Sequence, residues 1–289
     1  MSVHAVLGAG GVGGLMAGAL ARAGREVTVI VRPGSGHPDV VHVESDALGE
    51  FEVRVRVGER LAAPVDHLWV AVKAGALEAA IRQAPAELVR GSVIPLLNGV
   101  DHMAPLRACY GAGRVIAGAI RVESERVAPG RIRQSGPLLA VELGGPGELV
   151  DPVARELEEA GLRVTTGESP DRVLWGKLIM LAPFSLTATA SQLPLGGIAD
   201  DPGWRELMLG CMREVRQVAA ARGVELAEPV QMLEVAPRGM RTSMQKDAAA
   251  GRPLEVDHIA GPILRGGREH GIPTPCTERL VALIRERHG

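Results

Sequence analysis

A glycine-rich hexapeptide close to the amino terminus constrains the fold of this chain more than any other feature. Residues 8–13 read Gly-Ala-Gly-Gly-Val-Gly; they follow the apolar run Val3–Leu7 and precede Leu15–Ala23, which has helical composition. A strand, a glycine turn and a helix in this order are what a dinucleotide-binding Rossmann unit requires. The sequence therefore predicts a dinucleotide site made by Gly8, Gly10, Gly11, Val12 and Gly13.

Three glycines in this pattern each have a distinct physical role. Gly8 is expected to make the tight turn, Gly10 to let the backbone approach the pyrophosphate, and Gly13 to let helix and strand pack closely. The phosphates would lie at the helix amino terminus, where unpaired N–H groups and the helix dipole favour negative charge. The alternative is a glycine-rich turn that binds no ligand.

The residue after the second strand decides between the two nicotinamide dinucleotides. That strand, Val27–Val31, is followed by Arg32 and not by an acid. An acid would accept a hydrogen bond from a free ribose 2′-hydroxyl, whereas an arginine can bind a 2′-phosphate through several N–H donors. We therefore predict NADP(H) as the cofactor, with Arg32 as a solvated surface residue as the alternative.

Strands and helices continue to alternate after this opening. Leu68–Val72 and Val93–Leu97 are predicted strands, and Leu77–Val89 is a predicted helix between them, as in an open parallel sheet. Residues 114–143 contain short β-rich pieces separated by Pro129-Gly130 and Gly136-Pro137, which we interpret as an antiparallel closing of the sheet. Leu149–Ala160 and Leu162–Thr166 are expected to add a helix and a last strand.

After Gly167, the spacing at which apolar residues recur changes from two residues to about 3.6, which is typical of helices. We predict an α/β Rossmann domain over residues 1–168 and an all-α, substrate-binding domain over residues 169–289, with the boundary near the Gly, Ser and Pro residues of 167–170. The predicted helices of the second domain are Arg172–Ala190, Trp204–Arg222, Val230–Val235, Thr242–Ala250, Val256–His270 and Thr277–Arg287.

Composition excludes several other classes of protein. Lys and Arg total 32 against 34 Asp and Glu, and aromatic residues are 2% of the chain, so neither nucleic acid nor a membrane is an expected partner. The three cysteines are far apart, and the eight histidines show no metal-ligand spacing, so no disulfide framework and no metal are expected. The apolar start lacks a basic segment and is broken by glycines, unlike a signal peptide, and we expect a cytoplasmic protein.

Several short motifs, in order along the whole chain, resemble the ketopantoate reductase (2-dehydropantoate 2-reductase) family. No single motif is specific, but their order and spacing together are. After the glycine turn they are Val72-Lys73-Ala74, Asn98-Gly99, Trp175-Gly176-Lys177-Leu178, Arg241-Thr242-Ser243-Met244, Leu254-Glu255-Val256-Asp257 and His270-Gly271-Ile272-Pro273-Thr274-Pro275.

The resemblance implies an activity and roles for several residues. It implies NADPH-dependent reduction of ketopantoate to pantoate on the route to pantothenate and coenzyme A, and a homodimer joined through the helical domain. By resemblance, Lys177 is the general acid, Glu255 holds the substrate and Ser243 contacts its carboxylate. Lys73 and Asn98 correspond to positions near the nicotinamide and the substrate.

The chemistry of these residues fits such a reaction. Hydride addition to a ketone builds an alkoxide, which needs a proton donor and a positive charge beside it, and Lys177 supplies both. Glu255 is interpreted as a group that positions the substrate. The alternatives are structural: a solvent-facing Lys177, a first-turn Glu255 favoured by the helix dipole, and a Ser243 hydroxyl that serves backbone donors at a helix start.

The sequence departs from the family pattern on the helix that carries Lys177. The family has asparagines four and eight residues after the lysine, where this chain has Leu181 and Ser185. Leucine cannot hydrogen-bond a substrate hydroxyl, so a more apolar 2-oxo acid is an alternative substrate; Ser185 stays a predicted substrate-binding residue. The alternative of another class is a sensor that binds NADP(H) without turnover.

Overall fold

A five-stranded parallel sheet organises the amino-terminal part of the chain. The computed structural model describes residues 2–227 and 236–288. The strand order is β5-β2-β1-β6-β7, and every neighbouring pair is parallel, which confirms the predicted open parallel sheet; the edge strand β5 was not predicted. The strands are β1 (Val3–Leu7), β2 (Glu26–Ile30), β5 (Arg56–Gly58), β6 (His67–Val70) and β7 (Val93–Pro95).

A second five-stranded sheet corrects the sequence analysis. Residues 114–143 do not make an antiparallel closing of the first sheet: Val115 forms one parallel bridge to Val93 of β7, and the strands Ala117–Ala128 and Arg131–Gly144 then form a long antiparallel hairpin that turns at Pro129-Gly130 and pairs with Val40–Ser45. Gly136-Pro137 lies inside β9 and does not separate two strands. The order is β10-β9-β3-β4, with β8 also paired to β9. The strands are β3 (Val40–Ser45), β4 (Gly49–Arg54), β8 (Ala117–Ala128), β9 (Arg131–Gly144) and β10 (Arg163–Gly167).

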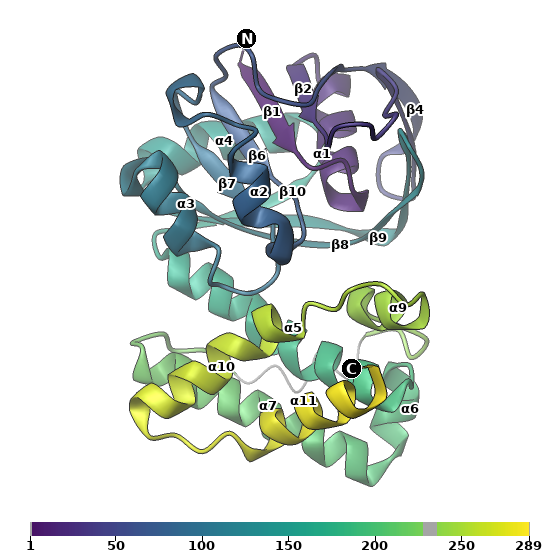
Figure 1. Ribbon diagram of the computed structural model, residues 1–289, viewed down its shortest axis with the longest axis vertical. Coiled ribbons are helices and arrows are strands. Elements are labelled where there is room, and N and C mark those ends of the chain that lie inside the picture. The colour runs from purple at the N-terminus through teal and green to yellow at the C-terminus, as the bar shows by residue number, and fades with distance from the viewer. Residues whose placement is uncertain (1, 228–235, 289) are drawn as a thin grey trace. The chain divides into compact units, whose positions relative to one another are not determined.

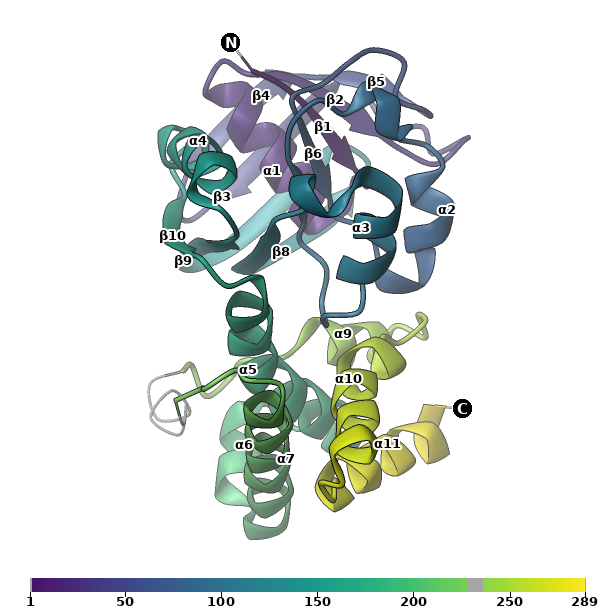
Figure 2. The ribbon, with the colours of Figure 1, turned by 90° about the vertical axis from the view of Figure 1, so that its left-hand side faces the viewer.

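Helix α1 (Gly11–Arg22) packs against both sheets, as Figures 1 and 2 show. Its residues from Gly13 to Leu20 are all buried. A Cβ on Gly14 would collide with the Ile132 side chain of β9, and one on Gly18 would lie 2.7 Å from Val43 Cγ2 of β3. Small residues on this helix therefore let the second sheet approach it closely.

The other helices of this part differ from the predicted ranges. The predicted helix Leu77–Val89 ends early: α2 covers Leu77–Ile81, and a separate 3-10 turn covers Ala86–Leu88. Pro85 explains the break, because proline lacks an N–H and restricts the residue before it. Helix α3 (Met103–Tyr110) was not predicted, and α4 (Gly147–Glu159) lies close to its predicted range.

The rest of the described chain is helical, which confirms the predicted all-α region. Five predicted helices are present: Val256–His270 has the predicted ends, and the other four have shifted ends. The predicted segment Val230–Val235 lies outside the described residues, and the short α6 was not predicted. The helices are α5 (Pro170–Ser191), α6 (Leu195–Asp200), α7 (Pro202–Ala221), α9 (Ser243–Ala249), α10 (Val256–His270) and α11 (Pro275–His288).

The chain divides into two units. Unit 1 contains Met1–Leu97 and His102–Val173, and unit 2 contains Asn98–Asp101 and Leu174–Gly289. Four residues that follow β7 in sequence therefore belong to the helical unit. The core of unit 2 is formed by residues of α5, α7, α10 and α11, among them Leu186, Val215 and Ile263.

Helix α5 is the one described helix that is long and apolar enough to cross a membrane by length and composition alone. Residues 178–199, most of which belong to it, contain no charged side chain, so the expectation that no uncharged stretch of 18 residues follows the amino-terminal region is wrong. In its most apolar window, 72% of the residues are buried inside the protein. Burial in unit 2 accounts for this composition as that of a core helix.

Two carboxylates, one exposed and one buried, accept hydrogen bonds from the first N–H groups of α7 and α11. Asp201 accepts hydrogen bonds from the N–H groups of Gly203 and Trp204 at the start of α7. Glu214, which is buried on α7, accepts from the N–H groups of Cys276 and Thr277 at 2.7 and 2.9 Å. Because the first N–H groups of a helix have no partner within the helix, Glu214 fixes the start of α11 against α7.

Candidate functional site

The glycine turn between β1 and α1 forms a tight elbow. Gly8 has a φ of +104°, a conformation that residues with a side chain rarely adopt, and its N–H donates to Ile30 O at 3.0 Å. A Cβ on Gly8 would lie 2.7 Å from Ala71 O, and one on Gly13 would collide with the Gly8 carbonyl oxygen. The elbow therefore requires glycine at both positions for steric reasons.

Gly10 differs from its neighbours because a Cβ there would meet open space. The first N–H groups of a helix have no partner within the helix, and Gly10, the N-cap residue of α1, has no side chain with which to satisfy them. An open backbone surface with N–H groups and a positive dipole end fits a phosphate group. The residues present at this elbow thus fit a dinucleotide.

Gly11 and Val12 form the first turn of α1. Val12 is half-buried against the core of unit 1. A Cβ on Gly11 would collide with the Ser124 carbonyl of β8, and the Ser124 hydroxyl donates to Gly11 O at 2.9 Å. Sequence reasoning missed Ser124, because its contact with Gly11 depends on how the second sheet packs on α1.

Two predicted cationic residues follow parallel strands at the same edge of the first sheet as the elbow. Arg32 comes after β2 and is exposed, and no acidic side chain in the described part of the chain pairs with its guanidinium. Lys73 comes after β6, is exposed and begins a 3-10 turn. The residues just before it, Ala71 and Val72, pack against Gly8. Lys73 therefore follows a segment that contacts the elbow, and Arg32 follows the strand whose Ile30 carbonyl accepts a hydrogen bond from Gly8.

In unit 2, the structure brings Asn98 and Glu255 together from distant parts of the sequence. The Asn98 side-chain amide donates to Glu255 Oε2 at 3.4 Å. Glu255 is 7% exposed and occupies the N-cap position of α10, but its carboxylate does not cap that helix. The alternative in which Glu255 acts only at the start of its own helix therefore does not account for its contact with Asn98.

Lys177 lies on α5 with Leu181 and Ser185 spaced one helical turn apart. Lys177 and Leu181 are half-buried, as are Met180 and Phe184, whereas most of the helix after Lys177 is buried. The Ser185 hydroxyl is buried and makes no hydrogen bond to any described residue. A buried hydroxyl without a partner is uncommon and identifies a position where a bound ligand could supply one.

Ser243 is the first residue of α9, and its side chain is exposed. The hydroxyl that caps this helix belongs to Thr242, which accepts from the N–H of Gln245 at 3.1 Å. The alternative that Ser243 serves backbone donors as the helix cap is therefore wrong, because Thr242 performs that task.

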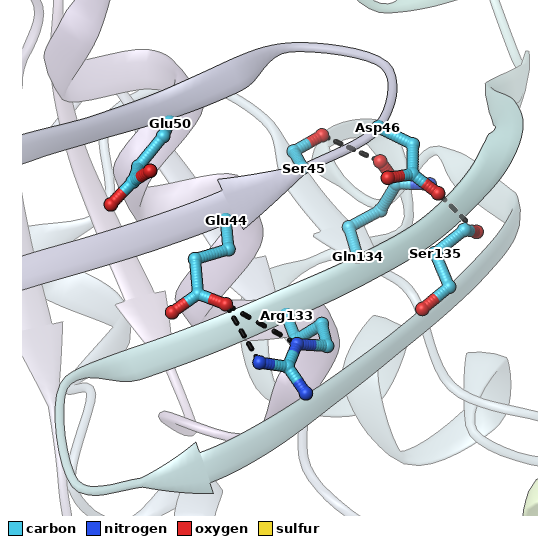
Figure 3. Close-up of a pocket in the computed structure, with 7 residues that line it drawn as sticks. All are labelled: Glu44, Ser45, Asp46, Glu50, Arg133, Gln134 and Ser135. Atoms are coloured by element: carbon cyan, nitrogen blue, oxygen red, sulfur yellow. Dashed lines mark hydrogen bonds and ion pairs between the residues drawn. The ribbon is translucent and has the colours of Figure 1, made fainter.

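A polar surface hollow of about 310 Å³ lies on the second sheet and involves none of the predicted site residues (Figure 3). Two of its charged side chains pair with each other: Arg133 binds Glu44 at 2.8 Å, and Arg131, which does not line the hollow, binds the same carboxylate at 3.2 Å. The hydrogen bonds from Arg133 and Arg131 lower the pKa of Glu44. The hollow is lined by Glu44, Ser45, Asp46, Glu50, Arg133, Gln134 and Ser135.

Comparison with known proteins explains why these residues occur together. The 2-dehydropantoate 2-reductase of Caulobacter vibrioides is 31% identical to this chain, over 98% of each protein. The solved 2-dehydropantoate 2-reductase of Geobacter metallireducens has a TM-score of 0.89 at 27% identity, covering 98% of this chain and 99% of that one. A D-mandelate dehydrogenase solved with NADH and anilino(oxo)acetate has a TM-score of 0.89 at 22% identity, over 99% and 98% of the chains, and shares the fold.

The family match covers both units. Residues 4–147 match the family described as ketopantoate reductase PanE/ApbA, and residues 171–288 match its C-terminal region. With the elbow, the Lys177 helix and the Asn98–Glu255 contact in place, the chain belongs to the ketopantoate reductase PanE/ApbA family of oxidoreductases.

Proposed function

We propose that this enzyme uses NADPH to reduce a 2-oxo acid to a 2-hydroxy acid, with ketopantoate as the first candidate substrate and pantoate as its product. This reaction would serve pantothenate and coenzyme A synthesis. The observation that carries the proposal is the elbow whose Gly10 backbone is open at the start of α1. Relatives named 2-dehydropantoate 2-reductase support the choice of substrate.

The residues of unit 1 would hold the dinucleotide. The N–H groups at the start of α1 would bind the pyrophosphate, and Arg32 would bind the 2′-phosphate of NADPH. The lack of an acidic partner for Arg32 among the described residues supports this role. Lys73, which follows the segment packed on Gly8, would lie beside the same cofactor. NADPH supplies the hydride.

The residues of unit 2 would hold the 2-oxo acid. As the carbonyl carbon gains a hydride, negative charge develops on its oxygen, and the Lys177 ammonium would stabilise that charge and then donate a proton to it. The Glu255 carboxylate would accept a hydrogen bond from a substrate hydroxyl, with Asn98 fixing its orientation. Ser243 and Ser185 would contribute hydroxyl contacts to the substrate.

Leu181 favours a second candidate substrate. It lies half-buried on α5, one turn from Lys177 and close in sequence to the half-buried Met180 and Phe184. An apolar side chain there would contact an aliphatic or aromatic group better than a hydroxyl. The fold leaves this choice open, because D-mandelate dehydrogenase shares it. A more apolar 2-oxo acid is therefore the rival to ketopantoate.

A panel of 2-oxo acids tests the proposal. Purified enzyme should oxidise NADPH when given ketopantoate, and the values of kcat/KM across ketopantoate and more apolar 2-oxo acids rank the two candidates. A far higher kcat/KM for an apolar acid would replace ketopantoate as the substrate. Tight NADPH binding without turnover of any acid would favour the sensor alternative. Light scattering of the same sample tests the predicted homodimer.

A further inference from the structure

The four residues Asn98–Asp101 lie along one face of α10 within unit 2. Asn98 contacts Glu255, Gly99 contacts the His258 carbonyl, and Asp101 pairs with Arg265. Positions 255, 258 and 265 are spaced by three and seven residues, which places them on one side of a helix. The contacts therefore follow one another in the same order along the loop and along the helix. We call residues 98–101 the α10-facing loop.

Two contacts in the middle of the α10-facing loop fix its distance from the helix. Gly99 has a φ of +81°, and a Cβ there would collide with the His258 carbonyl oxygen. Val100, which follows, packs against the hydrophobic core of unit 2. The loop backbone is thus pressed against α10 at Gly99 and anchored by an apolar side chain at Val100.

The ion pair closes the far end of the loop. A guanidinium nitrogen of Arg265 contacts Asp101 Oδ2, with the two side chains 46% and 43% exposed. A Cβ built on Gly261, one turn earlier on α10, would lie 2.7 Å from Arg265 Nη1, so the arginine folds back over a residue that has no side chain. This arrangement directs the charge of Arg265 along the helix surface toward the loop.

We propose that Asp101 and Arg265 are positioning residues for substrate binding, because their ion pair holds Asn98 in register with Glu255. The hydrogen bond between Asn98 and Glu255 is long at 3.4 Å, so it holds the loop weakly by itself. Fixing the loop at Asp101, three residues further on, restricts where the Asn98 amide can point. This inference rests on the proposed function, in which Glu255 and Asn98 contact the 2-oxo acid.

Hydrogen exchange measured by mass spectrometry tests the structural half of the proposal without any substrate. Arg265→Met should increase deuterium uptake in peptides that contain residues 98–101. The matched control is Arg285→Met, which removes the exposed ion pair between Arg285 and Asp257 of the same helix. Unchanged uptake at 98–101 in Arg265→Met, or an equal increase in the control, overturns the proposal.

Steady-state kinetics test the functional half. Arg265→Met and Asp101→Asn should each raise KM for the 2-oxo acid by about two- to fivefold, the range that a partly exposed ion pair provides, with a smaller effect on kcat. The double variant Asp101→Arg, Arg265→Asp should recover most of the loss, because it restores the pair with reversed charges. Arg285→Met should keep the wild-type KM.

A double-mutant comparison separates positioning from general stability. If the ion pair acts through Asn98, Arg265→Met should raise KM no further in an Asn98→Ala background. An equal additional rise in that background overturns the proposal. If wild-type enzyme reduces no 2-oxo acid, the proposed function fails, whereas the exchange measurement still decides whether the ion pair holds the loop.

Discussion

The Trp69 indole N–H donates to Nδ1 of His4 at 3.1 Å, between neighbouring strands of the parallel sheet. Because an indole N–H can only donate, Nδ1 of His4 accepts, and the ring proton lies on Nε2. That nitrogen is 3.1 Å from Glu156 Oε2 of α4. The cluster lies at the amino end of β1, whereas the glycine elbow follows its carboxyl end, so it serves stability and not the site.

This cluster should make the protein less stable in acid. Burial raises the pKa of Glu156, but hydrogen bonds from His4 and Ser2 and the nearby imidazoles lower it from 4.5 to about 2. A lowered carboxylate pKa contributes stability above about pH 4.5 that is lost as the pH falls toward 2. Burial and His4 also lower the pKa of His67, against the opposing charges of Glu156 and Asp66, so stability should begin to fall below about pH 6.5.

Urea unfolding across pH checks this prediction. Glu156→Gln should cost about 1–3 kcal/mol at neutral pH, because it weakens the bonds to buried His4, and should flatten the fall in stability below pH 4.5. His67→Gln should flatten the fall near pH 6.5 alone. A wild-type pH dependence in both variants would contradict the assigned roles.

Alanine at two elbow glycines should separate folding from cofactor binding. Gly13→Ala should destabilise the protein by about 1–3 kcal/mol or more, because its Cβ collides with the Gly8 carbonyl. Gly10→Ala should leave stability within about 0.5 kcal/mol, since its Cβ meets open space, yet weaken dinucleotide binding by blocking approach to the backbone. Thermal unfolding and NADPH fluorescence titration measure the two effects. Normal NADPH affinity in Gly10→Ala would remove the elbow from the cofactor site.

Arg32→Ala should reduce the preference for NADPH over NADH on the order of tenfold or more, because a charge-assisted contact to the 2′-phosphate is lost. The affinity for NADH, which lacks that phosphate, should change little. Arg60→Ala, which removes another exposed arginine of unit 1, is the control. Dissociation constants for both dinucleotides check the prediction, and an unchanged ratio in Arg32→Ala would leave the NADP(H) assignment without its residue.

Lys177→Ala should lower kcat on the order of a hundredfold or more, the usual contribution of a positioned general acid. Lys177→Arg keeps the positive charge but holds its proton too tightly to act as an acid, so it should recover substrate affinity and little of the rate. Turnover measured across pH with saturating NADPH checks both variants. A near-normal kcat in Lys177→Ala would exclude this lysine as the proton donor.

The sequence alone was enough to predict the features that depend on neighbouring residues. The elbow at Gly8 needs a positive φ, and the strand, turn and helix around it are contiguous, so local pattern identified them. The helices of unit 2 show periodic apolar residues and therefore appear near their predicted ranges. The half-buried Leu181, beside Lys177 on α5, was also evident as a departure from the family pattern.

Tertiary structure decided the features that depend on distant pairing. In β3, buried Val41 and Val43 alternate with His42 and Glu44, and β4 pairs with it as a local hairpin, so a local signal was present and was not used. Only the pairing of β3 with β9, which begins at residue 131, depends on a distant segment. The meeting of Asn98 with Glu255, and the pairing of Asp101 with Arg265, likewise join segments more than 150 residues apart. Local propensity does not encode such contacts, because they form only when separate elements pack and bury their shared surfaces.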